Sequence, residues 1–204
     1  MKRIAMIILP AFFMLLLLSG CSQESFISLY GFTERFTYCE LTPADFYSEK
    51  AEEGKMSYYT FLKKDNSCLM MKLLCNEENK TEEIRIYLPK YDENANKKKI
   101  SAEDINLFLK IVSASSTAFT GYDQATTEEI ITQMQLYEKK SYESEGELTK
   151  AKDNFYFVYH SALLGSEFII YNTYLKTIPE TEKPESKPMY GDTTKIRTET
   201  VPTK

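Results

Sequence analysis

Histidine and tryptophan are nearly missing from this chain of 204 residues, which holds one histidine and no tryptophan. Most metal sites in enzymes need several histidine or cysteine ligands at a fixed spacing, and no such cluster occurs in the sequence. Glycine is also scarce: the seven glycines stand singly and form no glycine-rich loop that could hold a phosphate. We therefore expect neither a bound metal nor a cofactor.

A surplus of basic residues is missing as well. The chain carries 25 Lys and Arg against 30 Asp and Glu, a formal net charge of −5. A nucleic-acid-binding protein needs a basic face that displaces counterions from the phosphates, so we expect no nucleic-acid partner. Hydrophobic residues make up 43% and charged residues 27% of the chain, which is typical of a globular protein.

The longest hydrophobic segment lies at the N-terminus. Met1-Lys2-Arg3 is a short basic stretch, and residues 4–18 form an apolar run interrupted only by Pro10. Fifteen helical residues span about 22 Å, which is shorter than the ~30 Å hydrocarbon core of a bilayer. The pattern is therefore typical of a signal peptide and less so of a permanent transmembrane helix.

Leu18-Ser19-Gly20-Cys21 follows this run directly. Together with the basic start and the apolar run, it resembles the lipobox of bacterial lipoproteins, in which an aliphatic, a small and a Gly or Ala residue precede an invariant cysteine. The resemblance covers residues 1–21. It implies a diacylglyceryl group on the Cys21 sulfur and cleavage before Cys21. Acyl chains such as palmitate would then anchor the protein to the outer, extracytoplasmic face of the cell membrane.

On this interpretation residues 1–20 are the leader, and residues 21–25 are the lipidated N-terminus and a short linker. The alternative is an ordinary secretory leader or an uncleaved anchor that carries a chance cysteine.

Three further cysteines, Cys39, Cys68 and Cys75, follow in the chain. An odd number cannot all pair internally. On one strand, Cys68 and Cys75 would point to opposite faces about 23 Å apart, too far for a disulfide. Cys39 could pair with either, but we favour free thiols buried in a sheet core.

Three segments begin with the same helix-start pattern, a hydroxyl residue followed three positions later by a carboxylate. They are Thr42-Pro43-Ala44-Asp45, Ser101-Ala102-Glu103-Asp104 and Thr126-Thr127-Glu128-Glu129. We expect helices over residues 43–53, over residues 102–119 with one apolar stripe, and over residues 127–137.

Six other segments have the alternation or the β-branched and aromatic content of strands. They are residues 56–62, 68–74, 83–88, 147–152, 155–163 and 168–175, with hairpin turns expected at 65–66 and 164–166. The element order predicts an α+β fold, an antiparallel sheet with helices packed on one side, within a single domain over residues 26–178.

The two halves of this domain suggest a tandem duplication of a helix followed by three strands. An offset of 84 lays Thr42 on Thr126 and Ile84 on Phe168, which gives repeats 41–90 and 125–176. Identity between them is very low, so coincidence is the alternative. In element order alone the arrangement is similar to β-lactamase-inhibitor-like tandem folds, and no motif supports transferring a function from them.

The composition changes at Pro179: residues 179–204 hold four of the seven prolines, many Thr, Glu and Lys residues and few apolar residues. Residues 179–204 cannot bury enough apolar surface to offset the entropy of ordering, so we expect a disordered, solvated tail. A tether or a recognition arm is the functional alternative.

Tyrosine is the one compositional excess, with fifteen residues, many of them on expected strands. Tyr58, Tyr87 and Tyr171 could present a recognition surface, because each ring gives contact area with a polar tip at a low entropic cost. The alternative is the ordinary preference of tyrosine for half-buried sheet positions.

The single histidine, His160, lies on the expected strand 155–163. No Gly-x-Ser-x-Gly, Ser-x-x-Lys or His-Glu-x-x-His motif accompanies it, so a hydrogen-bonded sheet residue is the favoured interpretation. The sequence as a whole favours a lipid-anchored, non-catalytic binding or interaction module with a protein or envelope ligand. The alternative is an envelope-associated hydrolase that uses distant carboxylates, or His160 with a remote serine.

Overall fold

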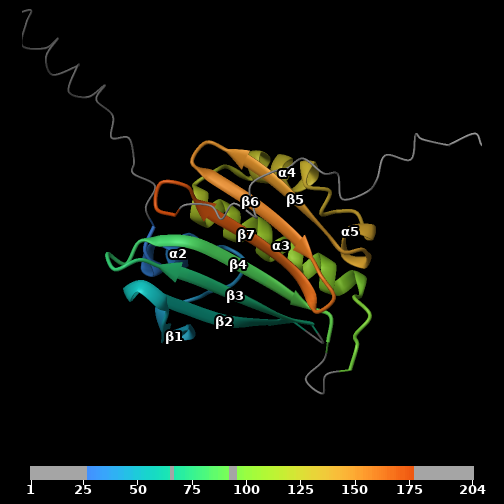
Figure 1. The fold of residues 1–204 in the computed structure, drawn as a ribbon, viewed down its shortest axis with the longest axis horizontal. Helices are drawn as coiled ribbons and strands as arrows, with labels where there is room; N and C mark the ends of the chain where they lie inside the picture. The colour runs from blue at the N-terminus through green and yellow to red at the C-terminus, as the bar shows by residue number, and fades with distance from the viewer. Residues whose placement is uncertain (1–26, 65–66, 92–95, 177–204) are drawn as a thin grey trace, which may run out of the picture.

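The computed structural model describes residues 27–64, 67–91 and 96–176. The predicted leader, Cys21, the turn at 65–66 and the segment 179–204 lie outside these residues. Seven strands form one antiparallel sheet in the order β1-β2-β3-β4-β7-β6-β5 (Figure 1). Their bounds are β1 Tyr47–Lys50, β2 Met56–Lys64, β3 Ser67–Cys75, β4 Thr81–Pro89, β5 Gly146–Lys152, β6 Phe155–Ser161 and β7 Gly165–Asn172.

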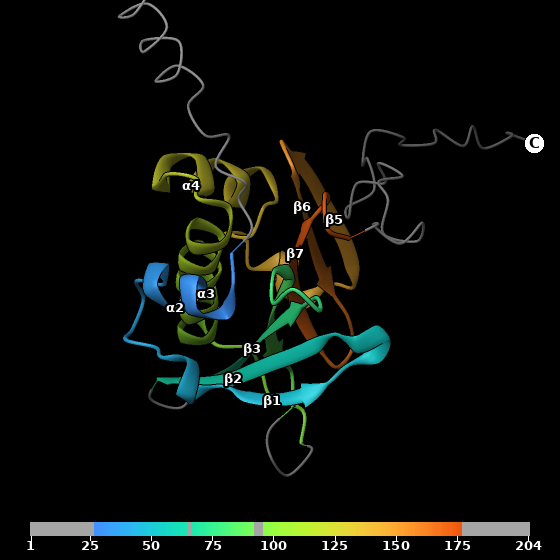
Figure 2. The same ribbon diagram turned by 90° about the vertical axis from the view of Figure 1, so that its left-hand side faces the viewer.

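Within the described residues, four α-helices accompany the strands: α2 Leu29–Arg35, α3 Ala102–Thr120, α4 Gln124–Gln133 and α5 Lys140–Glu143. In Figure 2, β1, β2 and β3 lie along the bottom of the molecule, β5, β6 and β7 rise along the right-hand side, and the helices fill the inner corner. The prediction of an α+β fold with helices on one side of an antiparallel sheet is confirmed. Within the described ranges, no helix is long and apolar enough to cross a membrane.

Alternation of side chains along the strands builds the main core. In β3 every second residue is buried, and Leu69, Met71 and Leu73 face the helices. From α3, Phe108 enters the same core and packs edge-on against the rings of Tyr142 and Tyr159. These aromatic contacts fix α3 and α5 against β6.

All six predicted strands are present, because their periodicity and their β-forming residues agree with the burial of each face. The turn after β6 comes slightly earlier than predicted. Gly165 and Ser166 already belong to β7, and the Ala162 N–H donates to the Gly165 carbonyl across the hairpin, at 2.9 Å.

The helix predicted over residues 43–53 is wrong. The Thr42 N–H and hydroxyl do donate to the Asp45 carboxylate, at 2.7 and 2.9 Å, but the capped element is a single 3₁₀ turn, Pro43–Asp45. The next residues form the exposed edge strand β1. A cap alone does not stabilise a short helix, and this segment has no apolar stripe to pack against the core.

The other two helix predictions hold with one shift. Ser101 caps α3 and Asp104 completes the capping box, as predicted. Helix α4 begins at Gln124, three residues before the predicted 127, because the Asp123 carboxylate accepts from the Thr126 N–H at 2.7 Å and caps the helix; it ends at Gln133, four residues before the predicted 137. Helix α2 was not predicted, since its seven residues are too few to show a period, although Phe32 is fully buried.

The strands, but not the helices, follow the predicted repeat. Strands β2-β3-β4 and β5-β6-β7 form two antiparallel meanders that meet where β4 pairs with β7. In that antiparallel pair Arg85 lies opposite Ile169. Because β1 and two 3₁₀ turns stand where the first repeat needs a helix, the helix-plus-three-strand unit is wrong for residues 41–90. A common origin of the two meanders stays a prediction.

Candidate binding groove

The three tyrosines predicted to form a recognition surface do not share one. Tyr58 lies on the helix side of the sheet and packs against the main core. Tyr87 and Tyr171 lie on the open face, the side away from the helices, whose middle row is Tyr59, Lys72, Arg85 and Ile169.

Neither of these two is a free ring. The Tyr87 hydroxyl donates to the Leu164 carbonyl at 2.9 Å, and Tyr171 is fully buried. The structure therefore does not bring the three predicted tyrosines together on one surface. Tyr58 and Tyr59 are adjacent, so the sequence did not show which of them would point outward.

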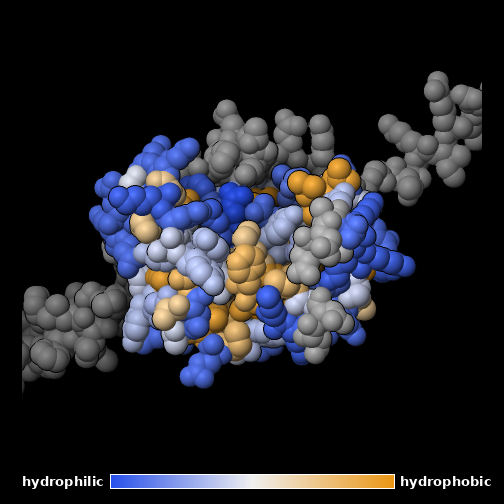
Figure 3. All heavy atoms as spheres, turned by 90° about the horizontal axis from the view of Figure 1, so that it is seen from below, coloured by the Kyte–Doolittle hydropathy of each residue, from blue (hydrophilic) through white to orange (hydrophobic). Residues whose placement is uncertain are grey.

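A different aromatic group is exposed on the open face. The rings of Tyr47 and Tyr59 stack with centroids 5.5 Å apart, and Phe61 stands edge-on to Tyr59. Tyr47 is 63% and Phe61 50% exposed, and both border a depression of about 620 Å³ with Lys63 and Cys68. Viewed from the side of β1 and β2, apolar side chains gather in the middle of the surface, with hydrophilic residues around them (Figure 3).

A longer depression runs along the outer side of α3, and we call it the α3 groove. Its central part, about 380 Å³, lies between Tyr38 and Tyr137, with Leu109 and Ala114 at its base. A part of about 690 Å³ continues past Ile105 to Lys99 and Lys139, and a part of about 140 Å³ extends to Lys64. The three parts share lining residues and therefore form one groove.

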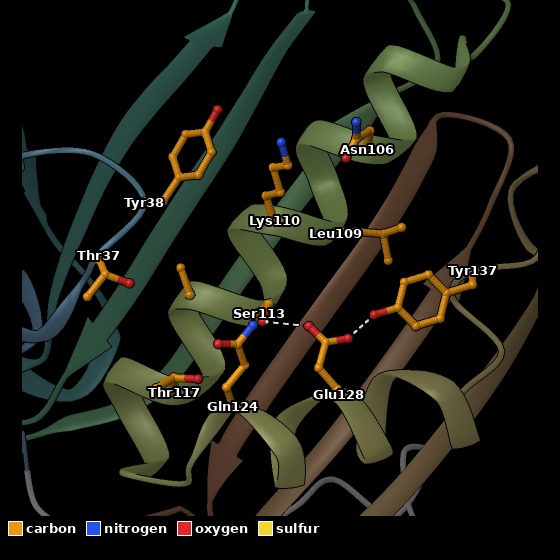
Figure 4. Close-up of a pocket in the computed structure, with 11 residues that line it drawn as sticks. Thr37, Tyr38, Asn106, Leu109, Lys110, Ser113, Thr117, Gln124, Glu128 and Tyr137 are labelled. Carbon is orange, nitrogen blue, oxygen red and sulfur yellow. Dashed lines mark hydrogen bonds between the residues drawn. The ribbon is translucent and has the colours of Figure 1, made fainter.

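The wall formed by α4 is held by hydrogen bonds. In Figure 4, Glu128 points from α4 toward α3 and meets Ser113 on one side and Tyr137 on the other. The Ser113 hydroxyl donates to Glu128 Oε1 at 3.3 Å, and the Tyr137 hydroxyl donates to Glu128 Oε2. Burial and the neighbouring Glu128 carboxylate raise the pKa of Tyr137 to about 12, so its hydroxyl stays a donor at neutral pH. This wall is preorganised for contact.

The rim of the groove is more basic than acidic. Lys64, Lys99 and Lys110 are exposed, and within the described part of the chain none of them forms an ion pair. Lys139 pairs with Glu143 at 3.2 Å. Of the two acidic residues in the lining, Glu128 already accepts two hydrogen bonds. The groove thus presents positive charge on a protein whose net charge is −5.

His160 lies far down the open face, between Glu147 of β5 and Glu167 of β7. It is exposed, and no hydrogen bond joins it to a hydroxyl, a thiol or a carboxylate among residues 27–64, 67–91 and 96–176. In the same ranges, no group of three or more His, Cys, Asp or Glu residues could hold a metal ion. The three described cysteines are free: Cys75 is buried, Cys68 half-buried and Cys39 exposed.

One serine does contact a lysine. The Lys90 ammonium donates to Ser161 Oγ at 3.0 Å and to the Ala162 carbonyl at 2.8 Å, and burial lowers the pKa of Lys90. Ser161 is fully buried, however, so a substrate could not reach its hydroxyl. The contact fastens the β6–β7 hairpin to the end of β4.

The groove residues come from segments far apart in the chain, and the sequence analysis did not find them. Tyr137 is the last residue of the helix predicted over 127–137, and Ile105 and Leu109 fall within the apolar stripe predicted for residues 102–119. The available signal was the width of that stripe, since Ile105 and Leu109 lie at its margin and are only half-buried. Comparison with protein-family models, with curated proteins and with solved structures finds no match to this chain.

Proposed function

We propose that the protein is a lipid-anchored, extracytoplasmic binding module that holds an acidic segment of a partner protein in the α3 groove. The observation that carries this proposal is the continuous groove, which has an aliphatic base, two tyrosine walls and exposed lysines that form no ion pair with any residue the structure describes. Cys21 supplies the anchor, and the groove supplies the contact surface.

The shape of the groove suits a polypeptide better than a small molecule. It follows α3 from Ser101 to Thr117, about 24 Å at 1.5 Å per residue. An extended segment of about seven residues has this length at ~3.3 Å per residue. Small-ligand pockets bury most of their ligand in one concave cavity, whereas this depression is shallow and long.

The chemistry of the groove suits an acidic segment that also carries an aliphatic or aromatic side chain. Leu109, Ala114 and the two tyrosine rings offer apolar contact, and tyrosine is favoured at such sites. Lys64, Lys99 and Lys110 lie along the rim and would attract carboxylates, which increases the association rate and selects against basic segments.

The test selects peptides from a random displayed library for binding to the purified protein, residues 22–204. We expect acidic peptides with at least one large apolar residue, and we expect Lys110→Glu to weaken their binding about tenfold, or ~1.4 kcal/mol. Lys50→Glu is the matched control, because Lys50 is exposed on β1, away from the groove. Peptides that bind both variants equally well, or a selection that enriches none, would contradict the proposal.

The same protein should be screened for turnover of envelope substrates. If the protein hydrolyses such a substrate and His160→Ala abolishes the hydrolysis, the alternative function, an envelope-associated hydrolase, is correct and the binding module is wrong.

A further inference from the structure

A second hydrophobic cluster lies on the open face, separate from the main core. It consists of Tyr156 and Val158 of β6 and Ile169 and Tyr171 of β7, with exposed fractions of 3%, 1%, 3% and 0%. We call it the open-face cluster. These values are those of a protein interior, although the helices all pack on the other side of the sheet (Figure 2).

The position of the cluster follows from the strand register. Tyr156 pairs with Tyr171 and Val158 pairs with Ile169, whereas the alternate residues Phe155 and Phe157 face the helices. A sheet with one face on the core normally presents polar residues to water on the other face. Four apolar or aromatic side chains with almost no exposed area therefore require a covering segment.

In the described chain, Lys176 reaches this face. After β7 the backbone turns at residues 173–175, and Lys176 returns over the sheet. Its ammonium lies 4.7 Å from the centre of the Tyr171 ring and forms an ion pair with Glu83. Lys176 covers the Tyr171 end of the cluster. The Val158–Ile169 pair lies two residues further along the strands, about 7 Å away.

We infer that the segment which follows Lys176 binds the open-face cluster, with Ile178 over Val158 and Ile169. Ile178 is the first aliphatic residue after Leu175. The Lys176 N–H donates to the Asn172 carbonyl at 3.0 Å, three strand residues or about 10 Å from Ile169, and two extended residues together with the Ile178 side chain span this distance. The same chain continues to residue 204, so the covering segment is covalently attached at the edge of the surface it covers. Residues 177 and 178 then cover the sheet of their own chain.

The test measures access to the cluster in purified residues 22–204, which lack Cys21, with a thiol reporter. Val158→Cys is introduced in a background of Cys39→Ser and Cys68→Ser, and labelling with a fluorogenic maleimide is followed over time. Cys75 is retained because it is buried. We expect slow labelling in this parent and at least tenfold faster labelling when Ile178→Asp is added. Ile196→Asp is the matched control and should leave the rate unchanged.

A second measurement identifies the covering segment and does not depend on the reporter variant. A benzoylphenylalanine placed at position 156 of the otherwise unaltered chain is photolysed, and the cross-linked peptide is identified by mass spectrometry. A link within one molecule to the peptide that begins at Thr177 supports the inference. A link to a second copy of the chain, or equal labelling rates with and without Ile178→Asp, would overturn it.

Discussion

Asp104 should be the carboxylate that matters most for the stability of this fold. It is 1% exposed at the start of α3 and accepts four hydrogen bonds. The donors are Ser67 Oγ at 2.7 Å, Lys98 Nζ at 2.6 Å, and the Ser101 N–H and hydroxyl at 2.9 Å each. These contacts join the first turn of α3 to the start of β3 and to the segment that precedes the helix.

We expect Asp104→Asn to destabilise the protein by about 2–4 kcal/mol. Hydrogen bonds to a charged group contribute ~1.5–3 kcal/mol, and breaking a buried ion pair costs ~3–5 kcal/mol. We expect a loss below the full cost of breaking a buried ion pair, because Lys98 is partly exposed and water screens its charge. Asp45→Asn is the matched control: it removes the charge from the same capping-box contacts with Thr42, but at an exposed site, and should cost far less.

The effect of Asp104→Asn should also depend on pH. Burial alone would raise the pKa of Asp104, but the bonds from Lys98, Ser101 and Ser67 outweigh it and lower the pKa. A carboxyl with a lowered pKa in the folded state stabilises that state above its unfolded pKa, about 3.9, and this stabilisation is lost as the pH falls through the folded value.

Urea unfolding followed by far-ultraviolet circular dichroism, at pH 7 and at successively lower pH, measures both effects. The gap between wild type and Asp104→Asn should be widest at pH 7 and should close below about pH 4. Equal losses for Asp104→Asn and Asp45→Asn at pH 7, or a gap that does not change with pH, would refute this reasoning.

Three further predictions concern the anchor, the tail and the core. Metabolic labelling with an alkyne fatty acid should mark the wild-type protein and not Cys21→Ala; equal label on both would rule out lipidation there. Limited proteolysis should leave a resistant product that ends near residue 178, and deletion of residues 179–204 should change the free energy of unfolding by less than about 1 kcal/mol. Phe108→Ala should cost about 3–5 kcal/mol in urea unfolding, since Phe108 is fully buried, whereas Leu164→Ala, at a 64% exposed position, should cost almost nothing.

The sequence predicted the elements whose signals are local. The alternation in β3 and the Ser101–Asp104 capping box of α3 were sufficient, because burial on one face and a satisfied helix terminus act within a few residues. The segment after Thr42 carries the same box but becomes β1, since pairing with β2 stabilises it more than a helix without an apolar face would.

The groove and the orientation of the tyrosines were not predictable in this way. Tyr38, Lys64 and Tyr137 are brought together only when α3 packs against its neighbours, and no pattern in the sequence connects them. Similarly, the side of the sheet on which a tyrosine lies depends on the register between strands. Tyr58 faces the core because it pairs with Leu73, and that pairing is set by the whole hairpin.

The pairing of β4 with β7 has a consequence for how the chain folds. The strands within each meander pair with their neighbours in sequence. Arg85 can pair with Ile169 only after the chain between them has been synthesised. Contacts so distant in sequence form late and slow the folding reaction. Until β7 arrives, β4 is an edge strand with unpaired backbone groups, which invites pairing with another chain. Glu83 and Arg85 place two charges on this temporary edge, so the residues at the centre of the finished sheet also protect the nascent half-sheet from aggregation.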